Sequence, residues 1–167
     1  MNALHKVLQA CLDVQLNTDI EYIDMIYSSQ TGQLDVFIAW YKHDDEYSAI
    51  NQYEFTRDLL ENPEYNIELE RVVRHIKSKT IEFYDKRISE QYSIDDKTEL
   101  HSQLMKTLNK IKDVTIGKQP EHFYIKYSYP KEKAVLYLIY PYGHEEIATF
   151  NPLSELIMIE TWCINEG

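Results

Sequence analysis

Glycine is scarce in this chain, and its scarcity limits the chemistry that the sequence can support. Only four glycines occur among 167 residues. No serine is flanked by glycine, and no glycine-rich loop is present that could cradle a phosphate group. Nucleophilic catalysis needs a serine or cysteine beside a histidine and an orienting acid, and no such motif is recognisable. We therefore expect a protein that is not an enzyme and that uses no cofactor.

Long apolar runs are also missing. No stretch approaches the ~20 apolar residues that a membrane-spanning helix needs. The first residues lack the continuous apolar block and the small-residue cleavage site of a signal peptide. We therefore expect a cytoplasmic protein that makes no contact with a membrane.

Cysteine is limited to Cys11 and Cys163, each among apolar neighbours. We interpret both as buried free thiols in preference to a disulfide bridge. A chain of this length, 44% hydrophobic, is long enough to bury its own core. We expect a single domain over residues 1–167.

Basic residues are scarce outside the middle of the chain. Residues 1–70 carry a net charge of −11, residues 71–133 carry +5, and residues 134–167 carry −5. An acidic field repels nucleic-acid phosphate and anionic lipid, and it attracts cationic protein surfaces. Two interpretations stay open: the acidity serves solubility, or it serves a basic protein partner.

Residues 21–42 alternate like two strands joined at Thr31-Gly32, where glycine supplies the positive φ angle of a tight turn. The second face of this hairpin carries Tyr22, Ile26, Phe37 and Tyr41. A two-residue loop predicts these cross-strand pairs: Tyr27–Val36, Met25–Ile38, Ile23–Trp40 and Glu21–Lys42.

Helical periodicity dominates two parts of the sequence. Residues 3–16 predict an amphipathic helix. Asn62-Pro63 is a helix-start signal, and one apolar face then continues to Ile88, which predicts one long helix of about six turns. Ser93 and Asp96 resemble a capping arrangement and begin a second helix that reaches about Lys112.

The remaining segments favour strands. Residues 47–55 could form a third strand or begin a helix, and their alternation favours the strand. Residues 146–150 predict another strand. Residues 153–164 are ambiguous between helix and strand. Residues 122–129 and 134–141 predict a second hairpin with a four-residue turn, and its pairs are Phe123–Tyr140, Ile125–Leu138, Tyr127–Leu136 and Tyr129–Ala134.

Strands, then helices, then strands predict an α+β fold. In it, an N-terminal helix and a central pair of helices pack on an antiparallel sheet built from two hairpins.

Two candidate sites are set aside. The runs His43-Asp44-Asp45 and His144-Glu145-Glu146 have metal-binding residue types but lack the helical histidine spacing of a zinc motif, so we expect acidic loops and no metal. The basic residues between Arg71 and Arg87 predict the solvated face of a helix. The acidic remainder of the chain opposes nucleic-acid binding there.

The preferred site combines carboxylates with tyrosines. Tyrosine offers a large contact area with a polar tip and is common at interface hot spots. Surrounding carboxylates would complement lysine or arginine on a partner. The candidate partner-binding residues are Asp44, Asp45, Glu46, Tyr47, Tyr53, Glu54, Asp58, Glu61, Tyr142, His144, Glu145 and Glu146.

The order of a helix, a hairpin closed by a glycine turn, and a strand ending in aromatics before DDEY resembles small immunity proteins of bacterial polymorphic-toxin and contact-dependent inhibition systems. The stretch that carries it is IYSSQTGQLDVFIAWYKHDDEY, residues 26–47, and the likeness covers residues 4–55. Those families are acidic, single-domain and non-catalytic, and each member binds a cognate toxin, often a basic nuclease. The resemblance implies a stoichiometric inhibitor of a toxin domain.

Two alternatives belong to other classes. The chain could be a structural or adaptor domain that self-associates through a tyrosine-rich sheet face, so a monomer or a weak homodimer is expected. It could also be an unrecognised enzyme with an acidic site.

Overall fold

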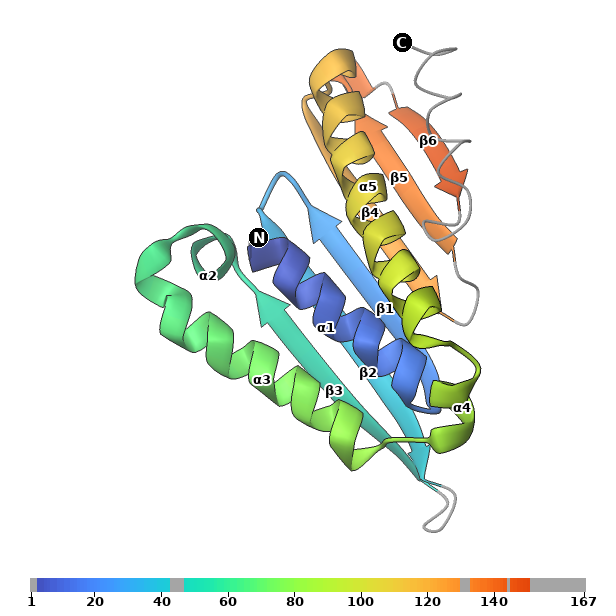
Figure 1. The fold of residues 1–167 in the computed structure, drawn as a ribbon. Coiled ribbons are helices and arrows are strands. Elements are labelled where there is room, and N and C mark those ends of the chain that lie inside the picture. The colour runs from blue at the N-terminus through green and yellow to red at the C-terminus, as the bar shows by residue number, and fades with distance from the viewer. Residues whose placement is uncertain (1–2, 43–46, 130–132, 144, 151–167) are drawn as a thin grey trace.

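The chain folds into two layers, an antiparallel sheet and a layer of helices over one of its faces (Figure 1). The computed structural model describes residues 3–42, 47–129, 133–143 and 145–150. Within that part, six strands form one sheet in the order β3-β2-β1-β4-β5-β6, and every neighbouring pair is antiparallel. The strands are β1 Ile20–Ser28, β2 Gln33–Lys42, β3 Tyr47–Phe55, β4 His122–Tyr129, β5 Lys133–Ile139 and β6 Glu145–Phe150.

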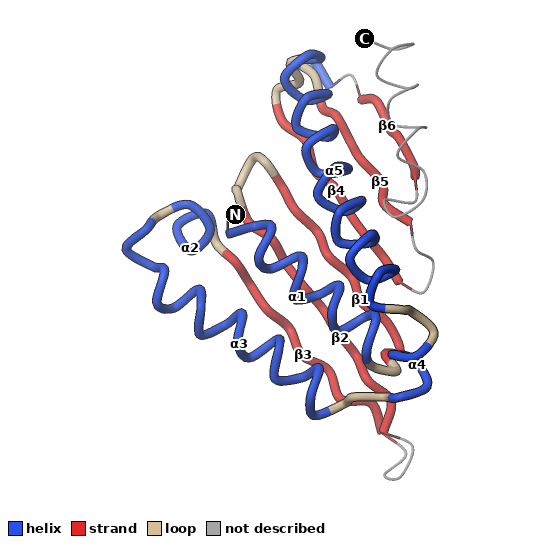
Figure 2. The backbone as a smooth tube through the Cα atoms, in the orientation of Figure 1, coloured by secondary structure: helices blue, strands red, loops and turns tan. Residues whose placement is uncertain are grey.

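Three long helices, α3, α1 and α5, lie side by side in front of the sheet (Figure 2). Their bounds are α1 Ala3–Asn17, α3 Asn66–Glu82 and α5 Ile94–Lys118, and the shorter elements are α2 Arg57–Glu61, α4 Lys86–Glu90 and the 3₁₀ turns Pro63–Tyr65 and Pro141–Gly143. The predicted α+β class is confirmed, as are the first helix, the third strand and the strand near residue 150. In the described part of the chain, no helix has the length and apolar character needed to cross a bilayer.

The main core lies between α1, α3 and strands β1 to β3. Alternate strand residues such as Ile23, Val36 and Phe55 are buried against helical residues such as Val14 and Ile76. The interface follows from the period of two along the strands and the apolar stripe along the helices. A smaller cluster on the same face is built by Ala134, Leu136 and Leu138, and α5 runs in front of these strands (Figure 1).

Cys11 lies in the main core as a free thiol, as expected. Burial raises the pKa of this thiol to about 12, so it behaves as a small apolar side chain. Cys163 and the ambiguous segment 153–164 lie outside the described residues.

The predicted register of both hairpins is wrong by two residues. In the first hairpin Met25 pairs with Val36, and residues 29–32 form the loop. In the second, Ile125 pairs with Leu136. The turn was placed with too few loop residues in the first hairpin and too far along the chain in the second. A shift of two keeps each side chain on its face because the side-chain period is also two, so the predicted inner and outer faces are correct.

The predicted long helix is interrupted at residues 83–85. Tyr84 forms a β-bridge with Thr18, and the backbone N–H of Asp85 donates to the carbonyl of Asn17 at 2.9 Å. The Asp85 carboxylate then accepts from the N–H of Arg87 and caps α4. The end of α1 therefore captures the backbone that would have continued α3.

Two further helix boundaries differ from the sequence prediction. Helix α2 was not predicted; Thr56 caps it by accepting from the N–H of Leu59. Helix α5 begins with the predicted capping box, in which Ser93 and Asp96 each accept from the other's backbone N–H. It then continues to Lys118, beyond the predicted end.

Gly32 permits the first hairpin turn, and replacing it with alanine is expected to destabilise the fold. Its φ is +68°, and an added Cβ would clash with the side chain of Arg57, whose guanidinium donates to the carbonyls of Ser29 and Gln30. Strain of this kind costs about 1–3 kcal/mol. Urea titration of Gly32→Ala should show that loss. Gly117→Ala, in α5 with open space around its Cβ, should show none; equal losses would contradict the explanation.

Candidate functional site

The described helices lie on one side of the sheet and leave its other face without a helix over it (Figure 1). On β1 and β2 this uncovered face carries Tyr22, Asp24, Ile26, Asp35 and Phe37, all of them only partly exposed. Ile50 on β3 is 60% exposed, and Ile147 on β6 is 56% exposed. This face combines apolar and charged side chains.

Three carboxylates gather on this face where β1, β2 and β3 run together. Asp35 pairs directly with Glu54 on β3, and its other neighbour is Ile26 on β1. Asp24 lies two residues along from Ile26 on the same face, which places it diagonally from Asp35. We call Asp24, Asp35 and Glu54 the acidic row.

The acidic row is not neutralised by the part of the chain that the structure describes. No ion pair is formed there by any of its three carboxylates. Asp35 accepts from the amide of Gln33 at 2.8 Å, and Glu54 accepts from that of Gln52 at 3.3 Å. Like charges directly opposite each other across strands are destabilising. The Asp35–Glu54 pair is therefore a local cost to the fold.

The other half of the same face is aromatic. Tyr124 on β4 and Tyr137 on β5 are cross-strand partners, and their rings stack with centroids 4.6 Å apart. Ile147 on β6 is the next residue in that row. Lys126 lies beside Ile26 between the aromatic half and the acidic row. The face thus has an acidic side on β1 to β3 and an aromatic side on β4 to β6.

The candidate residues predicted from the sequence do not form one surface. Glu54 lies on β3 and Glu145 on β6, and these strands are at opposite edges of the sheet. Asp58 and Glu61 are exposed on α2. The two predicted acidic groups are therefore separated by the four strands between them, and only Glu54 contributes to the acidic row.

Tyr53 is a core residue, which corrects its predicted place at the surface. It is 8% exposed and its hydroxyl is 3.0 Å from Nδ1 of His75 on α3. Burial raises the pKa of this phenol to about 12. The alternation was assigned correctly, but the apolar side of β3 faces the helices. Residues 43–46, His144 and the side chains of Tyr47, Tyr142 and Glu146 lie outside the described part.

The predicted site did not include Asp24 and Asp35, because neither residue lies in a run of adjacent acids. The signal was present in the alternation, since both residues fall on the second face of the first hairpin. That assignment does not depend on the register, because even shifts preserve faces.

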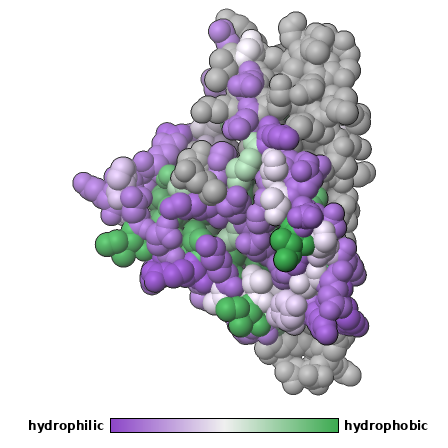
Figure 3. Space-filling model, in the orientation of Figure 1, coloured by the Kyte–Doolittle hydropathy of each residue, from purple (hydrophilic) through white to green (hydrophobic). Residues whose placement is uncertain are grey.

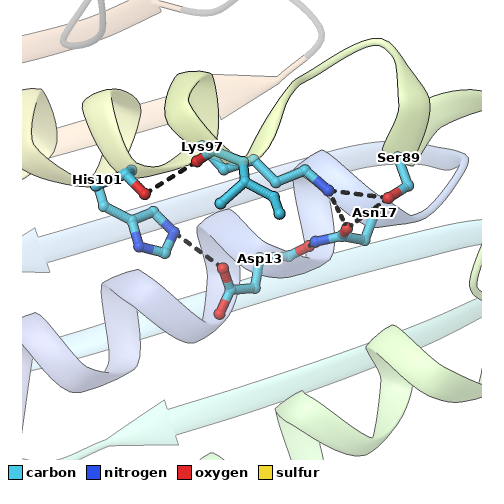
Figure 4. Close-up of polar contacts among 7 residues, drawn as sticks. Asp13, Asn17, Ser89, Lys97 and His101 are labelled. Atoms are coloured by element: carbon cyan, nitrogen blue, oxygen red, sulfur yellow. Dashed lines mark hydrogen bonds and ion pairs between the residues drawn. The ribbon is translucent and has the colours of Figure 1, made fainter.

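A second polar group lies on the helix layer, where α4 and α5 meet the end of α1 (Figure 4). Nζ of Lys97 donates to Oδ1 of Asn17 at 2.7 Å and to Oγ of Ser89 at 2.9 Å. The Ser89 hydroxyl also donates to Asn17, and Nε2 of His101 lies 2.9 Å from Oδ1 of Asp13. A lysine that activates a serine must lose its proton. The contacts of Lys97 join residues of α1, α4 and α5, so the group fastens these helices together.

An open groove of about 530 Å³ adjoins this polar group, lined by Asp13, Asn17, Lys77, Thr80, Ile81 and Tyr84. It separates α1 from the end of α3. The helix layer around it is mostly hydrophilic, and its hydrophobic spots are separate from one another (Figure 3). Exposed isoleucines of the helices are single residues, such as Ile67, Ile81 and Ile94. Scattered apolar residues of this kind need no partner.

Asp13→Asn is expected to stabilise the protein at neutral pH. Burial raises the pKa of Asp13 above its ordinary value, and His101, Lys77 and Lys97 oppose this shift only in part. The folded state therefore favours the protonated acid, and the unfolding free energy falls as the pH rises through the folded pKa. Asparagine removes that penalty. Urea titrations at pH 7 and at about pH 3.5 should show a gain that shrinks at the lower pH; a loss at pH 7 would contradict this.

Among the described residues, no three histidine, cysteine or acidic side chains lie close enough together to hold a metal ion. The comparisons with known proteins add no relationship. No protein-family model, curated protein or solved structure matches this chain.

Proposed function

We propose that this chain is an acidic binding protein that neutralises a basic protein by stoichiometric binding, in the manner of a cytoplasmic immunity protein and its cognate toxin. One observation carries the proposal: the acidic row lies on a sheet face that no described helix covers. The row costs the fold stability through its like-charge pair, and such local conflicts concentrate at functional sites. A cationic partner removes that conflict on binding.

The net charge of −11 supports the same proposal through kinetics. Complementary charge raises association rate constants from about 10⁵–10⁶ to as much as 10⁸–10⁹ M⁻¹ s⁻¹ at low salt. An inhibitor that must act before its target does damage benefits from fast encounter. The partner contact joins the acidic row to neighbouring apolar residues, with Phe37 and Ile26 supplying buried area.

The test uses basic nuclease toxin domains encoded beside this chain in its genome. Surface plasmon resonance of the purified pair should give an association rate constant that falls steeply as salt rises from 50 to 500 mM, roughly a decrease of tenfold or more. Loss of nuclease activity at a 1:1 ratio should accompany binding. Absence of binding to any such domain, or an association rate indifferent to salt, contradicts the proposal.

The stacked Tyr124–Tyr137 pair with Ile147 favours a second candidate function, self-association through the same face. An isologous dimer that uses the whole face brings two acidic rows into one interface, which opposes that arrangement. Sedimentation at micromolar concentration decides between the two functions, since a monomer removes self-association.

A further inference from the structure

Strand β3 ends the sheet in the part of the chain that the structure describes, and little protects its outer edge. It pairs with β2 over nine residues without a register shift. Natural proteins usually blunt an edge strand with proline, lysine, a bulge or short length. The sequence YSAINQYEF has none of these devices and a single charge, Glu54. Among the described residues, no strand pairs with the edge of β3 that points away from β2.

The charge around this edge selects the kind of strand that it accepts. Glu54 is exposed on β3, and Asp58 and Glu61 are exposed on α2 directly after it. Arg57 is committed to the carbonyls of the first hairpin turn. A basic segment paired with this edge would neutralise these acids. The edge therefore favours a cationic occupant.

We infer that an extended basic segment of the partner adds to β3 as a further strand, with alternate side chains on the uncovered face. This inference rests on the proposed function and names how the partner is held. Ile50 and Glu54 share that face, about 13 Å apart along the strand. The added strand accordingly places an apolar residue beside Ile50 and a lysine or arginine, four residues away, beside Glu54. Backbone pairing supplies affinity and these two positions supply specificity.

The other face of β3 is already occupied, so the recognising side chains of the added strand lie on the uncovered face. The Tyr53 hydroxyl contacts His75, and Phe55 is fully buried, so the inner face belongs to α3 and the core. New side chains find room on the uncovered face, beside the acidic row.

The probe is the capped peptide Val-Thr-Lys-Thr-Lys-Thr-Lys-Thr-Val, which offers the required spacing in either strand direction. The control peptide has glutamate in place of each lysine. Amide hydrogen exchange of the full chain, followed by NMR, should slow about tenfold or more at alternate β3 residues when the lysine peptide saturates it. The glutamate peptide should leave exchange unchanged.

Glu54→Gln should weaken the binding of the lysine peptide about fivefold. Glu121→Gln makes the same change in charge elsewhere and should not weaken it.

Each other outcome overturns the inference, and one of them separates it from the proposed function. If the lysine peptide perturbs Asp35 and Glu54 while β3 exchange stays fast, the peptide lies across the face, and the inference fails while the acidic binding surface stands. If both peptides slow exchange equally, the edge accepts strands of either charge, and the inference of a cationic occupant is wrong. If neither peptide slows exchange, the edge is closed to added strands. Failure of the proposed function is seen independently, in the toxin-binding measurements.

Discussion

Trp40→Ala is expected to lower the free energy of unfolding by about 3–5 kcal/mol, the largest single effect in the fold. Trp40 is 1% exposed, and its ring stacks on Phe83 with centroids 4.6 Å apart and planes 8° apart. Its Nε1 donates to the hydroxyl of Thr18 at 3.2 Å. The variant loses the buried area and leaves a cavity where β2, the end of α1 and the end of α3 meet.

Two further variants separate the contributions at this junction. Trp40→Phe keeps most of the buried ring and removes the hydrogen bond, so a loss of roughly 1–2 kcal/mol is expected. Ile67→Ala, at an 84% exposed position, should change stability by less than about 0.5 kcal/mol. Urea titration followed by circular dichroism measures all three. A loss below about 1 kcal/mol for Trp40→Ala would show that the junction repacks.

If the proposed function holds, the double variant Asp35→Lys, Glu54→Lys is expected to slow association with the proposed basic partner by about 100-fold and to reverse its salt dependence. The two side chains are cross-strand partners on the uncovered face, so both charges reverse at one place. Complementary fields speed encounter and opposed fields suppress it, by factors of 10–10³. Stopped-flow mixing at several salt concentrations measures the rate.

A matched control separates position from net charge. Asp113→Lys with Glu121→Lys makes the same change in charge at exposed positions, on α5 and just before β4, that have no part in the proposed contact. This control should slow association far less. Equal slowing in the two variants would show that the acidic row has no special role and that only the overall field matters. Thermal melts should be similar for all forms, because a like-charge pair replaces a like-charge pair in the acidic row and the control positions are exposed.

The side-chain faces of the strands could be predicted from the sequence, but the exact pairing could not. The apolar alternation of residues such as Ile23 and Val36 assigns each to the buried face whatever the loop length. The pairing depends on the loop, and the arginine contacts that hold residues 29–32 as a loop come from Arg57, a residue outside the hairpin. Local turn signals therefore placed both registers two residues away from the observed ones.

The candidate site was predicted only in part for a related reason. Runs of adjacent acids are conspicuous in a sequence, but strand order decides which acids become neighbours. Asp35 and Glu54 meet because β2 lies between β1 and β3, while Glu145 is carried to the far edge by β5. Tyr53 likewise is a residue type that is common at interfaces, but its position in the fold is in the core.

By itself, the sequence determined the α+β class, the inner and outer faces of the strands, the first helix, the capping box at Ser93 and the acidic balance of the chain. These features depend on short-range periodicity and composition, and both are properties of the sequence alone. Only the tertiary structure decided the two registers, the break after α3 and the assembly of the acidic row on an uncovered face. Each of those arises from contacts between residues distant in sequence, such as Tyr84 with Thr18 or Asp24 with Phe37, and the energy of such contacts exists only once the chain has folded.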